Sequence, residues 1–285
     1  GEQRYDEETK KILVSDVRIK RFVRTYLEDI EGEHIYVSEN TGAGKTDSKG
    51  VLTWIAQKWN TNQKTDIAEI MKELIDVRLF GGISTLDKNM KVGKQEFVNG
   101  HVQFTGPVQF AALNPSLNRV NLRMHQNTSH FTSKDDKAQG AISTTTLVPY
   151  SVVQIHGWIN PTVAKNTDLK EDDLQKMFKA LWYGTGGEGS SFSRSKVGQN
   201  SLLLLVIDYK QDFDKVYGVD RTIKLEPNEE GMKDEQIRSM EDYTLDFSKL
   251  KDLAKNDKIE KIRFYTEIDK IKNELNGEKF EEMSL

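Results

Sequence analysis

One stretch decides the fold: Trp182-Tyr-Gly-Thr-Gly-Gly-Glu-Gly-Ser-Ser-Phe-Ser-Arg-Ser-Lys-Val-Gly-Gln-Asn200, followed by Ser201-Leu-Leu-Leu-Leu-Val-Ile-Asp-Tyr-Lys210. The apolar run from Leu202 to Ile207 predicts a central strand buried on both faces. The glycine-rich half has little to pack, but its backbone can approach another chain closely. Its serines, Arg194 and Lys196 can donate hydrogen bonds to phosphate.

Two interpretations of this glycine loop stay open: a loop that contacts a polyanion, and an ordinary surface loop. A third is excluded. Gly184, Gly186 and Gly189 match the spacing G-x-G-x-x-G, but a dinucleotide-binding motif follows a strand and opens a helix. Here the order is reversed, because a helix expected over 168–183 precedes the loop.

Length and composition indicate a sizeable folded protein of 285 residues without cysteine. No run of 18 apolar residues and no leader of the secretory type is found, so we expect a cytoplasmic protein without disulfides. Residues 211–285 hold 20 acidic and 14 basic side chains, a net charge of −6, against −4 for the whole chain. This leaves +2 for residues 1–210, so a nucleic-acid surface would be a local stripe.

The first helix is expected from Ser15 or Asp16 to about Ile30, after a polar loop over 1–11 with no apolar strand before the helix. Steps of 100° per residue place an apolar face opposite three cations, with Arg18 on the flank. The four cations could follow a phosphate backbone or form a solvated face. The apolar face comprises Ile19, Phe22, Val23, Tyr26, Leu27 and Ile30, and the cations are Arg18, Lys20, Arg21 and Arg24.

A short strand is expected at His34–Val37, before a loop that ends like a P-loop, Thr41-Gly-Ala-Gly-Lys-Thr46. Glu39 stands where the first glycine of that motif belongs and would oppose the phosphates. We favour a loop that carries Lys45 and Lys49 near nucleic acid, with ATP binding as the alternative.

Residues 111–140 are polar and too long for a routine connection, so they are expected to be functional or disordered. Two histidines there, His125 and His130, could hold a metal, but without a matched carboxylate pair solvated histidines are favoured. Before the glycine loop we further expect a helix over 66–80 closed by Gly81-Gly82, a strand over 97–110 broken at Gly106-Pro107, strands over 141–149 and 151–159, and a helix capped by Thr167 or Asp168. In the tail we expect strands at 221–225 and 262–265 and helices near 233–241 and 267–275.

Six motifs in order resemble a known family. The sequence is similar to the backbone subunit of CRISPR Cascade, the seventh CRISPR-associated (Cas-seven) family, most of all its type I-B branch, over roughly residues 5–210. The motifs are Ser15-Asp-Val-Arg-Ile-Lys-Arg21, Asp76-Val-Arg-Leu-Phe-Gly-Gly82, Gly106-Pro-Val-Gln-Phe110, Ser116-Leu-Asn-Arg-Val120, Gly140-Ala-Ile-Ser-Thr-Thr-Thr-Leu-Val-Pro-Tyr150 and Ser193-Arg-Ser-Lys-Val-Gly-Gln199.

The resemblance implies an α+β fold, a modified RNA-recognition-motif (ferredoxin-like) antiparallel sheet with helices. Residues 1–210 would form the palm, with fingers at about 33–100 and a thumb at about 111–140. Residues 211–285 would be a charged extension packed on the palm. Members of the family begin with an apolar strand and an Asn-Pro-Asn-Gly-Asp-Pro turn, so we expect the first strand of the sheet to be missing from this sequence.

The resemblance also implies a non-catalytic subunit without cofactor that coats the guide RNA (crRNA). Copies would stack head-to-tail in a right-handed filament, each thumb displacing a nucleotide and leaving the rest for pairing with target DNA. Further partners would be the large, fifth-family cap, small and processing subunits of Cascade, with no membrane. The aromatic base-stacking signature of ordinary RNA-recognition motifs is not found here, so stacking by that route is not expected.

Site residues implied by the resemblance fall into three groups. Guide phosphates would be contacted by Arg18, Lys20, Arg21, Arg24, Ser193, Arg194, Ser195, Lys196 and Gln199. Lys45 and Lys49 would lie in the fingers. The thumb would carry Arg119, Arg123, Met124, His125, Phe131, Lys134 and Lys137.

Two enzymes remain as alternatives. One is a metal-dependent RNA endonuclease, as in the related type III backbone subunits, with Asp135 or Asp136 as the cutting aspartate; a solvated turn is favoured there. The other is a P-loop nucleotide-binding enzyme that uses Lys45. No Ser/His/Asp arrangement is found.

Overall fold

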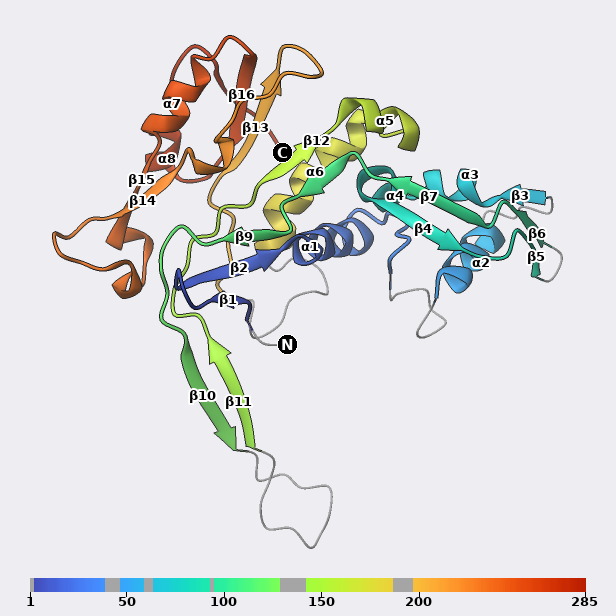
Figure 1. Cartoon of the computed structure of the whole chain (residues 1–285), viewed down its shortest axis with the longest axis horizontal. Coiled ribbons are helices and arrows are strands. Elements are labelled where there is room, and N and C mark those ends of the chain that lie inside the picture. Colours follow the sequence, from blue (N-terminus) through green and yellow to red (C-terminus); the bar gives the residue numbers. More distant parts are fainter. Residues whose placement is uncertain (1–2, 39–46, 59–63, 93–94, 129–141, 187–196) are drawn as a thin grey trace, which may run out of the picture. The chain divides into compact units, whose positions relative to one another are not determined.

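The computed structural model describes residues 3–38, 47–58, 64–92, 95–128, 142–186 and 197–285, and its class is α+β (Figure 1). The chain divides into two compact units. The helix unit comprises Asp16–Phe110, Gly157–Lys215 and Asn256–Leu285. The hairpin unit comprises Gly1–Ser15, Ala111–His156 and Val216–Lys255. Within the described ranges, every helix is too short or too polar to cross a membrane.

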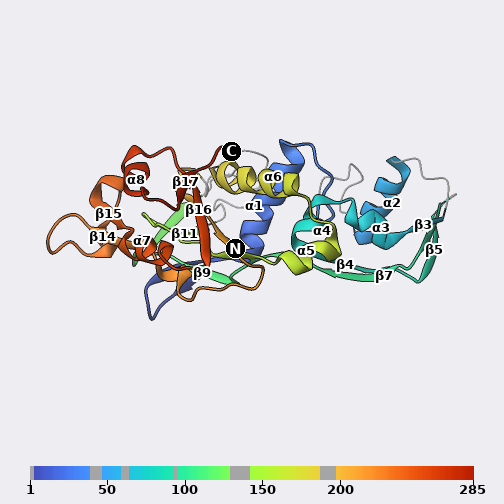
Figure 2. The same ribbon diagram turned by 90° about the horizontal axis from the view of Figure 1, so that it is seen from above.

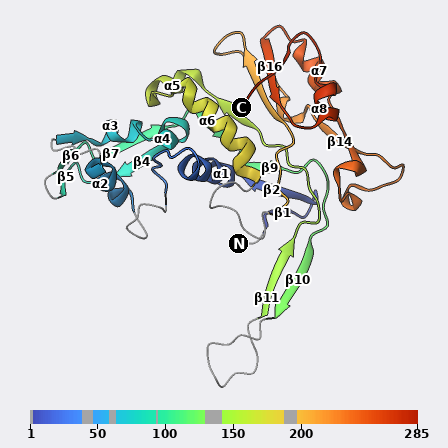
Figure 3. The ribbon, with the colours of Figure 1, turned by 180° about the vertical axis from the view of Figure 1, so that it is seen from behind.

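Two helices, α1 (Asp16–Asp29) and α6 (Glu171–Tyr183), pack side by side in the helix unit, as Figure 3 shows from behind. Their apolar faces share one core with α4 (Ile75–Phe80) and β8 (Val108–Phe110). The expected cap of α6 at Thr167 or Asp168 is wrong. Asp168 instead ends a separate helix, α5 (Pro161–Thr167), in a left-handed conformation with φ 57°, and α6 begins after Lys170.

The helix expected over 66–80 is two helices, α3 (Ile67–Lys72) and α4. Arg78 explains the break. Its Nη1 donates to the backbone carbonyls of Lys72 (3.1 Å) and Glu73 (2.7 Å), which are orphaned where α3 ends. A second core forms where α3 packs against α2 (Ser48–Lys58), with Leu52, Ile55 and Met71 fully buried.

Gly81 and Gly106 let two backbone segments touch. A Cβ at Gly106 would lie 2.0 Å from the carbonyl carbon of Phe80, and one at Gly81 would lie 2.3 Å from the carbonyl oxygen of Phe104. The Gly81-Gly82 pair therefore opens a strand as well as ending the helix: β4 (Gly81–Thr85) pairs with β7 (His101–Thr105), seen lengthwise in Figure 2. The predicted break at Gly106-Pro107 is confirmed, because a new strand, β8, follows it.

The remaining strands of the helix unit form three small sheets. β8 pairs with β12 (Gly157–Ile159), and β6 (Gln95–Val98) pairs with β3 (Lys64–Asp66) and β5 (Asn89–Val92). The third holds the apolar run after the glycine loop, β13 (Leu204–Tyr209), with β16 (Ile259–Tyr265) and β17 (Phe280–Glu282).

The expectation that this apolar run forms a central strand is wrong. β13 lies at one edge of the sheet β13-β16-β17, and all its residues are half-buried. Leu204 and Val206 pack on the core that α1 and α6 share, which explains their apolar character. The tail strand near 262–265 is confirmed in β16, and the helix near 267–275 in α8 (Asp269–Glu274).

In the hairpin unit, β2 (Lys11–Ser15) lies between β1 (Tyr5–Asp6) and β9 (Leu113–Pro115). The expectation of a loop without a strand before α1 is therefore wrong, and three apolar residues suffice for this strand because both of its edges are paired. The strand expected at His34–Val37 does not form. The amides of Tyr36 and Val37 donate to the Asp76 carboxylate instead of to another strand.

A long hairpin leaves this unit: β10 (Arg123–Thr128) pairs with β11 (Ile142–Leu147) from Arg123↔Leu147 to Thr128↔Ile142 (Figure 1). The unit also holds β14 (Lys224–Pro227), β15 (Tyr243–Asp246) and α7 (Ser248–Ala254). The helix expected near 233–241 is wrong, because two short 3₁₀ turns stand there, Asp234–Gln236 and Met240–Asp242.

Candidate nucleic-acid interface

The cations of α1 occupy three environments. Arg21 is exposed, at the centre of the helix face turned away from the core. Arg18 is half-buried, with its guanidinium 4.4 Å from the centre of the Phe22 ring. This cation–π contact holds the Arg18 stem along the helix.

Lys20 and Arg24 are not simply turned to solvent, as the sequence predicted, because their side chains are only 14% and 16% exposed. Arg24 Nε donates to the fully buried Asp76 carboxylate (2.8 Å), and Lys20 Nζ lies 3.2 Å from an Asp16 oxygen. Both cations also lie over the ring of Phe80, at 5.3 and 5.8 Å. The prediction for Ile30 is likewise wrong, because its side chain is 52% exposed.

Burial, and then the charge of Arg21, lower the pKa of Arg18. The second cause shows that the two guanidinium groups repel each other across the helix surface. Arginine stays charged at every physiological pH. Two mutually repelling cations raise the local positive potential, and an anion such as phosphate relieves it.

The glycine loop starts and ends beside α1. A Cβ at Gly184 would lie 3.0 Å from the Phe22 carbonyl oxygen and 3.1 Å from the Tyr26 Cβ, so the loop leaves α6 in contact with α1. Thr185 and Ser201, on opposite sides of the loop, are joined through their hydroxyl oxygens at 2.6 Å, and both oxygens lie within hydrogen-bonding distance of the Leu181 and Trp182 carbonyls. The ends of the loop are therefore fixed next to the helix that carries Arg18 and Arg21.

Gln199 follows the loop and is exposed, like Val197 and Gly198 before it. The structure thus places Gln199 near the start of the loop, because its carbonyl oxygen lies 3.8 Å from where a Cβ of Gly186 would stand. Ser193, Arg194, Ser195 and Lys196 lie outside the described residues.

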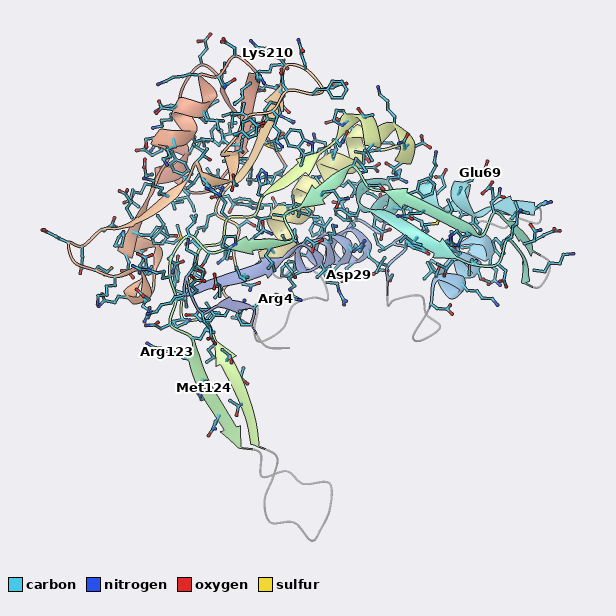
Figure 4. The ribbon with its side chains drawn as sticks, viewed as in Figure 1. Arg4, Asp29, Glu69, Arg123, Met124 and Lys210 are labelled. Carbon is cyan, nitrogen blue, oxygen red and sulfur yellow. The ribbon has the colours of Figure 1, made fainter. Side chains whose placement is uncertain are left out.

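The hairpin carries the described thumb residues. Arg123, Met124 and His125 on β10 are exposed, Met124 by 82%, and Figure 4 shows Arg123 and Met124 standing out from the ribbon. Arg119 lies before the hairpin and is engaged within its own unit: its amide donates to Asp234 (3.2 Å), and its guanidinium lies 3.7 Å from the same carboxylate. Phe131, Lys134 and Lys137 lie outside the described residues.

Lys49 is exposed on α2, and Lys45 lies outside the described residues together with His130, Asp135 and Asp136. The P-loop and endonuclease alternatives therefore rest on residues that the structure does not describe. In the described part of the chain, no three His, Asp or Glu side chains are grouped as metal ligands.

The motifs of the sequence also contain residues that hold the scaffold. Arg78 makes a bidentate, buried ion pair with Asp173 (2.7 Å to each oxygen), and Asp173 also caps the start of α6. Buried Asn114 and Asn118 close the base of the hairpin, accepting from the amides of His156 (2.9 Å) and Val152 (3.0 Å). The sequence patterns assigned no role to these residues. A polar residue among apolar ones can nevertheless indicate a buried side chain that hydrogen-bonds several segments.

The fold and site define an α+β protein in which helix α1, which carries Arg18 and Arg21, contacts Gly184 at the end of α6. The sequence profile described as "CRISPR-associated protein Cas7" matches residues 1–248, so the chain belongs to the Cas7 family. A relative from Haloferax volcanii, also described as "CRISPR-associated protein Cas7", is 25% identical over 259 residues, which cover 87% of this chain and 74% of that protein. A solved chain titled "CRISPR RNA-guided surveillance complex, pre-nicking" is 12% identical over 76% of each chain, with a TM-score of 0.42.

Proposed function

We propose that this chain is the non-catalytic backbone subunit of a type I Cascade, most similar to type I-B, and that it coats crRNA. Family membership supports the class of role. The observation that supports the RNA surface is the contact of Gly184 with α1, because Gly184 stands where the glycine-rich loop begins and α1 carries Arg18 and Arg21.

Such a surface binds the ribose-phosphate backbone and ignores the bases. Guanidinium groups and glycine amides both donate to phosphate oxygens, so affinity is largely independent of sequence and falls steeply with salt. A subunit that coats any guide needs this property, because base pairing supplies the target specificity. Arg21 and Arg18 would supply the main phosphate contacts. Lys20 and Arg24 would contribute with the donors not engaged by Asp16 and Asp76.

The other predicted contacts join this proposal. Ser193, Arg194, Ser195, Lys196 and Gln199 would cradle the phosphates from the loop, and Lys45 and Lys49 would reach the RNA from the fingers. The hairpin with Arg119, Arg123, Met124, His125, Phe131, Lys134 and Lys137 would be the thumb. Head-to-tail stacking is a heterologous contact that does not close, so the guide and the other Cascade subunits would set the filament length in the cytoplasm.

The test is to purify the protein from cells that express a CRISPR array. We expect an ultraviolet absorbance ratio typical of bound nucleic acid, and RNA of a uniform length set by the guide. Recovery of the protein without RNA, or with random fragments only, would contradict the proposal. Adding magnesium and a complementary RNA to the same complex tests the endonuclease alternative. Periodic cuts in the complementary RNA would show that the protein cleaves it.

A further inference from the structure

The hairpin unit contains a pocket of about 410 Å³. Its lining residues lie far from the cations of α1 along the sequence. Its wall is formed by the turn after residue 215 and by helix α7. Apolar and cationic side chains line it together: Val216, Tyr217, Arg221, Thr222, Lys249 and Leu253.

The charge of this pocket contrasts with its surroundings. Residues 216–255 hold ten acidic and seven basic side chains, yet the described lining contains two cations and no carboxylate. Asp220 lies 3.4 Å from Arg221, but both side chains are well exposed, and such surface pairs are weak in water. Asp246 lies nearby: hydrogen bonds from Ser248 lower the pKa of this carboxyl most, and the charges of Lys224 and Lys249 lower it further. The lining therefore suits a small acidic group next to an apolar one, and the acidic surroundings disfavour a long polyanion.

An element with this chemistry lies on the same chain, in the turn after β13 that leads on from Lys210 (Figure 4). Phe213 and Tyr217 are each 87% exposed, more than any other large apolar side chain of the described residues. Phe213 stands between Asp212 and Asp214, and the amide of Asp214 closes the turn on the Gln211 carbonyl (3.0 Å). An aromatic ring flanked by two carboxylates complements an apolar pocket with two cations.

We propose that two copies of this chain associate reciprocally, with Phe213 of each copy entering the pocket of the other. Asp212 and Asp214 then face Arg221 and Lys249. Phe213 precedes Val216 by three residues, so ring and pocket start within about 10 Å of each other along the chain. In this dimer each copy gives its ring and receives that of the other about a two-fold axis, which is an isologous interface. The contact goes beyond the proposed function, because it needs no RNA.

Sedimentation velocity of the whole chain, freed of nucleic acid and measured over a concentration series, tests this contact. We expect a monomer–dimer equilibrium that Phe213→Ala weakens by at least about tenfold. The paired reversals Arg221→Glu/Lys249→Glu and Asp212→Lys/Asp214→Lys should each leave a monomer. Met240→Ala and Lys224→Glu, exposed residues outside the pocket, are the matched controls and should sediment like the wild type.

Mixing the two charge-reversed proteins tests whether the turn of each copy binds the pocket of the other. In the mixed dimer, the charge-reversed pocket of one variant faces the charge-reversed turn of the other, and these charges attract. The second contact joins a wild-type pocket to a wild-type turn, so the dimer should form again. A wild-type protein that stays monomeric, or a mixture that does not restore the dimer while both variants unfold like the wild type, would overturn the proposal. Unchanged sedimentation with loss of single-stranded DNA binding in Arg221→Glu/Lys249→Glu would overturn it in favour of a nucleic-acid pocket.

Discussion

Helix α1 and the β10–β11 hairpin are built in opposite ways. Helix α1 is anchored by buried charge, because Arg24 donates to Asp76, whose other oxygen accepts from a backbone amide. The hairpin is a two-stranded ribbon whose described side chains on β10 are exposed, and such ribbons are marginal alone. Among the described residues, the base of the hairpin is held by buried side chains that include Asn114 and Asn118. The difference separates a helix that buried charges hold in place from a hairpin with few such contacts among its described residues.

The largest loss of stability is expected from replacing Arg78 in the helix unit. Replacing it with Met leaves Asp173 buried without its cation, and we expect the free energy of unfolding to fall by about 3–5 kcal/mol. Urea unfolding followed by circular dichroism measures this. Lys72→Met, which breaks the exposed pair with Asp168, is the control and should cost less than about 1 kcal/mol. Similar losses in both variants would show that the buried pair is not what holds the helices together.

A smaller effect is expected at Gly184. A valine there pushes against the Phe22 carbonyl and Tyr26, so we expect the free energy of unfolding to fall by about 1–3 kcal/mol. RNA binding should weaken as well, because the residue that begins the loop shifts away from α1. Gly186→Ala is the control, because its Cβ would meet a nearest atom only at 3.8 Å. If Gly184→Val binds RNA as tightly as the wild type, the position of the loop does not matter for binding.

The hairpin should behave differently. Replacing Met124–Thr146 with Asn-Gly closes the strands at the first pair and keeps Asn114 and Asn118. We expect the free energy of unfolding to change by less than about 1 kcal/mol, because a two-stranded ribbon adds little stability. The regular nuclease footprint on the bound RNA should disappear. A footprint that persists would remove the thumb role from this hairpin.

The smallest expected effect concerns His34, whose ring meets Trp54 edge-on at 5.5 Å. Burial, and then Lys58, lower its pKa below the ordinary value of 6.5, although Glu33 and Glu28 oppose this. The neutral ring therefore contributes stability above that ordinary value, and this is lost as the pH falls through the lowered pKa. Between about pH 7 and about pH 5, unfolding curves of His34→Gln should lose less stability than those of the wild type. Equal losses would show that His34 does not titrate with folding.

The sequence predicted α1 and its cations because both follow from local periodicity. It could not predict that Arg24 pairs with Asp76, or that both Arg24 and Lys20 lie over Phe80, because these partners stand more than fifty residues further along the chain. The Lys20–Asp16 pair is local, four residues apart on the helix. The break at Glu73 is likewise invisible locally, since it depends on the side chain of Arg78. The edge position of β13 was missed for a related reason. An apolar run shows that a strand is covered, but not whether helices or other strands cover it.

The most direct measurement compares wild-type protein with Arg18→Ala/Arg21→Ala in fluorescence titrations of two unrelated single-stranded RNAs over a range of salt concentrations. Loss of two phosphate contacts should weaken binding equally for both sequences. It should also lower the slope of log affinity against log salt by about 1.4. The free energy of unfolding should change by less than about 0.5 kcal/mol, because Arg21 is exposed and Arg18 half-buried. An unchanged salt slope, or a loss confined to one of the two sequences, would contradict the phosphate-binding role of helix α1.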